Sequence, residues 1–139
     1  MFYKELITCL MTDSNITDTI TTYENLPSIF QQEAPEAAEK PYIIVRIETS
    51  PLLDKVVATS TVFIDYYDYD ISSRVQAGKA ARAIEDRLDH NKLRTENLTD
   101  IRFTMIDDGF IPAGDPRTIH HNNTFSCRAA RSGWMRRNK

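Results

Sequence analysis

The chain has 139 residues, of which 41% are hydrophobic and 27% are charged, and its formal net charge at pH 7 is −3. This length suits one domain with its own hydrophobic core, and the composition excludes collagen-like, disordered and disulfide-stabilised classes. Residues 1–13 lack the basic start of a secretion signal and are too short to span a membrane, so we expect no general export and no membrane partner.

The two cysteines, Cys9 and Cys127, stand among apolar neighbours and lack the spacing of a metal or catalytic pair. A free thiol in such surroundings behaves as a small hydrophobic group. We therefore expect both cysteines to be buried and reduced.

Charge is distributed unevenly along the chain. Residues 1–70 contain 4 basic and 12 acidic side chains, whereas residues 71–139 contain 13 basic and 8 acidic ones. The two halves either neutralise each other within one domain or give the molecule unlike faces that can stack or close head to tail.

The first third of the chain predicts a helix, an arm and a strand. Residues 2–12 place apolar side chains at the spacing of an amphipathic helix. Residues 14–41 are less regular and contain three prolines, which favours an ordered extended arm from about 21 to 41 on the surface. Residues 42–49 alternate between apolar and polar side chains, as a strand does.

The middle of the chain joins a long strand directly to a helix. Residues 57–67 alternate, with Val62, Ile64 and Tyr66 on the face expected to form the core. A helix follows over residues 71–88, with Asp70 as its cap. Its expected buried stripe comprises Ile71, Val75, Gly78, Ala81, Ile84 and Leu88.

Two further strands are predicted at residues 101–107 and 123–134, separated by a long loop at about 107–122. The order is therefore helix, two strands, helix, two strands. This pattern predicts an α+β fold in which two helices pack on one face of a mainly antiparallel four-stranded sheet.

The other face of that sheet mixes apolar, polar and charged residues and is a candidate interface. Either a partner subunit covers this face or the proline-containing arm closes it. The residues expected there are Tyr42, Ile44, Arg46, Thr59, Thr61, Phe63, Asp65, Tyr67, Arg102, Thr104, Ile106 and Arg128.

Catalytic and metal sites have little support in the sequence. Asp65 and Asp68 point to opposite faces of a regular strand, and adjacent His120 and His121 lack the helical spacing that lets two histidines share zinc. A serine-centred elbow and a glycine-rich phosphate loop are missing as well. We therefore expect no cofactor, no metal and no enzyme activity.

A basic C-terminal segment leaves one alternative open, a small metal-dependent nuclease or nucleic-acid-binding domain that uses Asp65 and Asp68. A regulatory or ligand-binding α+β domain is a further alternative. The basic residues of the segment are Arg128, Arg131, Arg136, Arg137 and Lys139.

Three segments together resemble one known family. They are IFQQEAPEAAEKPYIIVRI, then STVFIDYYDYDISSRVQAGKAARAIEDRL, and finally FSCRAARSGW after a long loop. In this order they resemble the tail-completion, or tail-terminator, proteins of long-tailed bacteriophages, which join the tail tube to the head connector. The loop at 107–122 is longer than the family pattern leads us to expect.

The resemblance implies a structural virion protein at the tail–head junction, assembled in the host cytoplasm. It implies a ring, usually of six copies, that caps the tail tube and meets a head-side connector or stopper protein, while DNA passes through without specific binding.

In such a ring we expect the contact with a neighbouring subunit or partner to include Arg46, Thr61, Phe63, Asp65, Asp115, Arg117 and Arg128. Phe63→Glu is then predicted to leave a folded monomer that cannot assemble.

Overall fold

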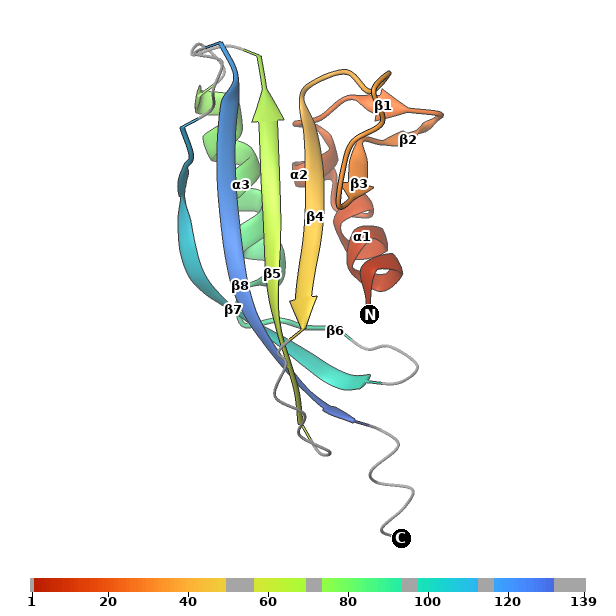
Figure 1. Ribbon diagram of the computed structural model, residues 1–139, viewed down its shortest axis with the longest axis vertical. Helices are drawn as coiled ribbons and strands as arrows, with labels where there is room; N and C mark the ends of the chain where they lie inside the picture. Colours follow the sequence, from red (N-terminus) through yellow and green to blue (C-terminus); the bar gives the residue numbers. More distant parts are fainter. Residues whose placement is uncertain (1, 50–56, 70–73, 94–97, 113–116, 132–139) are drawn as a thin grey trace, which may run out of the picture.

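The computed structural model describes residues 2–49, 57–69, 74–93, 98–112 and 117–131, and its centre is a curled six-stranded sheet (Figure 1). The strand order is β3-β4-β5-β8-β7-β6, and β1 and β2 form a separate two-stranded ribbon. The helices are α1 (Tyr3–Met11), α2 (Ser14–Thr17) and α3 (Arg74–Leu88). The strands are β1 (Thr22–Tyr23), β2 (Leu26–Pro27), β3 (Ile29–Gln31), β4 (Tyr42–Thr49), β5 (Val57–Asp68), β6 (Lys92–Leu93), β7 (Leu98–Phe110) and β8 (Ile119–Arg131).

The predicted α+β fold with a four-stranded, mainly antiparallel sheet is wrong. The fold is mainly β, and its sheet is mixed because β3 pairs with β4 in parallel. The additional strands β3 and β6 are only three and two residues long. Strands this short carry no alternating pattern, and their pairing with β4 and β7 is what makes them strands.

The hydrophobic core lies between the helices and one face of the sheet. α1 packs against β3 and β4, and α3 packs against β5, β7 and β8. Ile64, Ile84 and Phe125 are fully buried there, and each contributes about 1.5–3 kcal/mol through the apolar surface that it removes from water. Figure 1 shows the helices on one side of the sheet.

The buried stripe of α3 differs from the predicted one. Ala81, Ile84 and Leu88 are buried as expected, but Val75 is 71% exposed and Gly78 is exposed. Ile71 and the expected cap Asp70 lie outside the described residues. The sheet contacts a row of alanines instead, which bury little surface each but allow close approach of helix and sheet. Those additional buried residues are Ala77, Ala80 and Ala83.

The predicted arm is partly regular. Before the arm, Asp13 accepts a hydrogen bond from the backbone N–H of Asn15 at 2.9 Å and thereby caps the short helix α2. β1 and β2 then form a tight hairpin, and β3 adds a parallel strand beside β4. The arm therefore extends the sheet at its edge.

β7 and β8 form a long antiparallel pair that shortens the predicted loop. β7 continues to Phe110 and β8 begins at Ile119, so both strands enter the range 107–122 assigned to a loop. A register shift between Met105 and Asp107 marks a bulge in β7. Residues 132–134 of the predicted last strand lie outside the described residues.

Among the described residues, the helices are too short or too polar to cross a membrane.

Candidate functional site

The sheet face opposite the helices is open to solvent over much of its area. Thr59, Arg102, Thr104 and Arg128 on this face are all exposed. The arm, which was the alternative cover for this face, lies along the β3 edge beside β4 (Figure 1). Gln32 of the arm lines the hollow described next, so the arm borders this face without covering the four exposed residues.

A hollow of about 360 Å³ lies in this face, and it brings together several of the predicted contact residues. Arg46, Phe63 and Asp65 line it as expected. The remaining lining residues are Gln32, Ile44, Tyr67, Asp107, Ile111, His120, Asn122 and Thr124.

Asp65 forms the buried centre of the hollow. Its Oδ1 lies 2.8 Å from His120 Nε2 and accepts a hydrogen bond from Asn122 Nδ2, also at 2.8 Å. Thr124 Oγ1 in turn donates to Asn122 Oδ1. The side chain of Asp65 is only 8% exposed. Asp65 therefore joins β5 to β8 within the chain, and its carboxylate is less available to a partner than the sequence predicted.

Arg46 and Phe63 form the accessible part of the hollow. The guanidinium carbon of Arg46 lies 4.5 Å from the centre of the Phe63 ring, a cation–π contact. Arg46 Nη1 also lies 3.6 Å from Glu48 Oε1 on the same strand. The pair presents a flat aromatic surface and a cation, which is a combination common at protein interfaces.

Aromatic rings continue from the hollow towards the β3 edge. Neighbouring rings along this row lie 4.3–5.9 Å apart between centroids. Burial is the main cause that raises the pKa of Tyr67, and it also raises the pKa of Tyr42. Both phenols therefore stay neutral at physiological pH. The row comprises Tyr23, Phe30, Tyr42, Tyr67 and His120.

The other predicted contact residues that the structure describes do not line the hollow. Thr61 is half-buried opposite Ser126, and Arg128 is exposed opposite Thr59 and Arg102. Arg117 is exposed, and Asp115 lies outside the described residues.

Six lining residues of the hollow were not among those expected on this face. Three of them, His120, Asn122 and Thr124, belong to β8, and the others are Gln32, Asp107 and Ile111. His120, Asn122 and Thr124 face one side of β8 at alternate positions, and the alternation begins at residue 119. The apolar alternation was followed only from residue 123 onwards, so His120 and Asn122 were assigned to the loop.

In the described part of the chain, no three His, Cys, Asp or Glu side chains lie close enough together to hold a metal ion. Asp65 lies in the open face, whereas Asp68 Oδ2 lies 2.9 Å from the hydroxyl of Tyr66, a core residue. The two carboxylates thus serve opposite faces of β5, as predicted from the strand's alternation.

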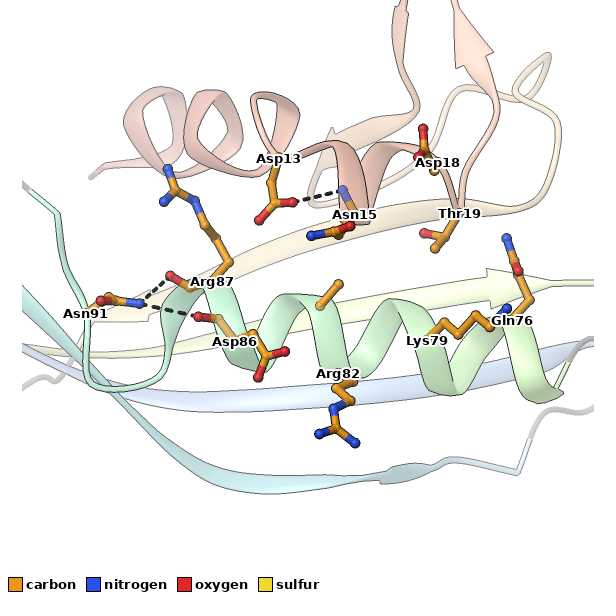
Figure 2. Close-up of a pocket in the computed structure, with 11 residues that line it drawn as sticks. Asp13, Asn15, Asp18, Thr19, Gln76, Lys79, Arg82, Asp86, Arg87 and Asn91 are labelled. Carbon is orange, nitrogen blue, oxygen red and sulfur yellow. Dashed lines mark hydrogen bonds between the residues drawn. The ribbon is translucent and has the colours of Figure 1, made fainter.

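A larger hollow of about 660 Å³ lies between α2 and α3 (Figure 2). Asp13 and Asp18 line it on one side, and Lys79 and Arg87 of α3 line it on the other. Two of its lining residues bond helix ends: Asp13 accepts from the N–H of Asn15 at the start of α2, and Asn91 Nδ2 donates to the carbonyl of Arg87 at 2.8 Å.

Comparison with solved structures shows the fold. A chain from a structure described as "Virion of native gene transfer agent (GTA) particle" matches with a TM-score of 0.69 and 14% identity, covering 91% of this chain and 92% of the other. A second solved chain, whose description names no function, matches with a TM-score of 0.61 and 9% identity over 94% and 97% of the two chains. No protein with a curated description matches the sequence.

The family model for "Tail completion protein gp17" matches residues 4–130, which includes both faces of the sheet and all three described helices. This match confirms the resemblance drawn from the three sequence segments. The chain therefore belongs to the tail completion protein gp17 family and is a structural protein of the bacteriophage tail, located in the virion.

Proposed function

We propose that this protein forms a ring, with six copies expected, that closes the tail tube and joins it to the head-side connector or stopper protein. DNA passes through the ring without specific binding. In this role the chain is a structural element and performs no catalysis.

The observation that carries the proposal is the open sheet face around the hollow. The chain belongs to a phage tail family, and its exposed sheet face mixes aromatic and charged side chains. A surface of this kind suits contact with another protein. The uneven charge of the two halves of the chain also favours unlike surfaces that meet head to tail. The gene transfer agent neighbour, which comes from a virion, agrees with an assembled role.

On this face, we propose that Phe63 and Arg46 contact a neighbouring virion subunit, together with Thr61 and Arg128. Arg117, which precedes β8, is a further proposed contact residue. Asp65 supports them from beneath, because its hydrogen bonds fix β5 against β8. Asp115 remains a proposed contact residue from the sequence alone.

The ring is tested by light scattering and negative-stain electron microscopy of the purified chain, alone and with tail tubes. Rings, free or on the tube ends, are expected. Tails that lack the protein are expected to stay unjoined to heads and to recover when the protein is added. Heads that join such tails equally well without it would contradict the proposal.

Phe63→Glu tests the contact face. The side chain is only half-buried, so the variant is expected to keep the circular dichroism spectrum of the wild type. It is expected to lose assembly, because a carboxylate replaces the aromatic surface beneath Arg46. Thr8→Glu on the helical side, where Thr8 is exposed, is the matched control and should assemble normally. Normal assembly of Phe63→Glu would remove Phe63 from the contact surface.

A further inference from the structure

Six large apolar side chains of the described residues are exposed, and their positions are uneven. Leu26 lies in the hairpin of β1 and β2, Tyr69 follows the end of β5, and Ile106 lies within β7. Phe110 is the last residue of β7, Ile111 follows it, and Val75 lies in the first turn of α3. The hairpin and the end of β7 are at opposite edges of the molecule (Figure 1).

The hairpin presents Leu26 and Glu24 to solvent. Leu26 is 57% exposed, and Glu24 is exposed. Glu24 and Asn25 have φ angles of 49° and 67°, so they form the two-residue turn that favours Asn and Gly. Asn is common in this left-handed backbone conformation, so Asn25 fits the turn. Glu is uncommon in it, so the turn itself does not favour Glu24. The hairpin is held in place by Tyr23, whose ring packs edge-on against Phe30 at 5.6 Å.

The opposite corner presents two apolar side chains and a cation. Val75 is 71% exposed and Phe110 is 50% exposed. The guanidinium of Arg74, at the start of α3, lies 5.6 Å from the centre of the Phe110 ring, and Arg74 is exposed. We name this surface, formed by Arg74, Val75 and Phe110, the α3 corner.

The hairpin and the α3 corner lie at the same level of the sheet. Thr21, just before β1, donates its backbone N–H to the carbonyl of Pro41 at 3.0 Å. Tyr42, the next residue, is in register with Tyr67, and Tyr67 with His120. The carbonyl of His120 accepts from the N–H of Ile111 at 2.8 Å. One row of the sheet thus connects the two surfaces across its full width.

We infer that the hairpin of one copy docks on the α3 corner of the next copy. Leu26 then packs against Val75 and Phe110, and Glu24 lies opposite Arg74. This inference rests on the proposed ring, and it adds a contact between neighbouring copies to the one proposed for the open face. The two surfaces differ from each other and lie at opposite ends of the same row of the sheet. A contact between them is heterologous, and such a contact can repeat around a ring. We assign the partner as a second copy of this chain because the two surfaces complement each other. The hairpin carries an apolar side chain and an acidic one, and the α3 corner carries apolar side chains and a basic one.

A charge exchange tests the contact. Glu24→Arg and Arg74→Glu are each expected to weaken self-association at least tenfold, because each places like charges opposite one another. The double variant, which restores an opposite pair with the signs reversed, is expected to recover most of the wild-type association. Sedimentation velocity over a concentration series measures the change, and circular dichroism verifies the fold. Lys79→Glu, an exposed charge reversal on the same helix, is the matched control and should associate as the wild type does.

Leu26→Asp and Val75→Asp test the apolar part of the contact. Both side chains are more than half exposed, so both variants should fold and lose self-association. Wild-type association of these variants would overturn the inference and leave the ring intact. Failure of the double charge variant to recover would overturn the pairing of Glu24 with Arg74. A wild-type chain that stays monomeric both alone and on tail tubes would instead overturn the proposed ring, and with it this contact. Loss of binding to another virion protein, with self-association unchanged, would assign the surfaces to that protein and overturn the inference.

Discussion

Asp65 and His120 lie 55 residues apart in the sequence, and the structure places Asp65 Oδ1 2.8 Å from His120 Nε2 across strands β5 and β8. The same oxygen accepts a hydrogen bond from Nδ2 of Asn122 at 2.8 Å. A carboxylate that is almost fully buried is tolerated because these two donors compensate for the water that it loses. This contact therefore holds the open face together from beneath.

Asp65→Ala is expected to lower the free energy of unfolding by about 1–3 kcal/mol, since it leaves the buried Asn122 amide without its acceptor. Urea denaturation followed by circular dichroism measures the change. Asp65→Asn retains an oxygen acceptor and should cost less. Glu33→Ala, an exposed acidic residue of the arm, should change stability by no more than about 0.5 kcal/mol. Equal stability of Asp65→Ala and the wild type would show that the carboxylate contributes nothing to the fold.

Ile84→Asp is expected to abolish folding, because Ile84 is fully buried between α3 and the sheet and a carboxylate there has no described partner to replace water. Ile84→Ala should cost about 2–5 kcal/mol through loss of apolar burial and the remaining cavity. Thermal unfolding by circular dichroism measures both.

Val75→Asp is the control on the same helix, because Val75 is 71% exposed although the sequence pattern placed it in the core. At a protein concentration low enough to keep both chains monomeric, its melting temperature should stay close to that of the wild type. A Val75→Asp variant that fails to fold would mean that the helix presents the originally predicted stripe to the sheet.

Tyr66→Phe is expected to destabilise the fold by about 1–3 kcal/mol. The hydroxyl of Tyr66 lies 2.9 Å from Asp68 Oδ2 and 3.1 Å from the carbonyl oxygen of Thr19, so it connects β5 to the residues after α2. Burial raises the pKa of Tyr66, and Asp68 raises it further. Removing the hydroxyl leaves the buried Asp68 with one donor fewer.

Tyr69→Phe removes the same hydroxyl from a side chain that is 57% exposed, and it should be close to neutral. Chemical denaturation of the two variants and the wild type gives the comparison. Equal stabilities for both substitutions would show that the buried hydroxyl has no structural role.

His121 is expected to make stability fall as the pH drops below about 6.5. Burial lowers its pKa, and this effect outweighs the opposing influence of Asp108, whose Oδ1 lies 3.0 Å from His121 Nε2. The unfolded chain retains the ordinary pKa of about 6.5 and so binds more protons than the folded chain below that pH. The contribution of neutral His121 is therefore complete above pH 6.5 and decreases between that pH and its lower folded pKa.

The free energy of unfolding at pH 7.5, 6.5 and 5.5 tests this expectation in the wild type and in His121→Phe. The variant retains a ring beside Phe110 but cannot titrate. Carboxylates titrate in both proteins, so the difference between the two curves isolates His121. Parallel curves over this range would contradict a lowered pKa.

The long elements were predictable because each contains enough residues for its pattern to repeat. The strand predicted over 57–67 is observed as Val57–Asp68, and the helix predicted over 2–12 is observed as Tyr3–Met11. Side-chain alternation also separated Phe63 of the open face from the buried Val62 and Ile64.

The short elements and the α3 stripe were not predictable in the same way. β3 and β6 have three and two residues, fewer than one full repeat of any pattern, and they exist because β4 and β7 offer hydrogen-bonding partners. On α3, hydrophobicity favoured Val75, but the close contact with the sheet selected the smaller Ala77 and Ala80.

The sequence by itself determined the long strands, the two long helices that precede and interrupt them along the chain, and the family to which the chain belongs. These follow from local periodicity and from the order of segments. Only the tertiary structure decided that the sheet has six strands with a parallel edge, that Asp65 is buried by His120 and Asn122, and that the hairpin and the α3 corner share one level. These features depend on the register between strands that are distant in sequence. Register is set by the packing of the whole core, which no single segment encodes.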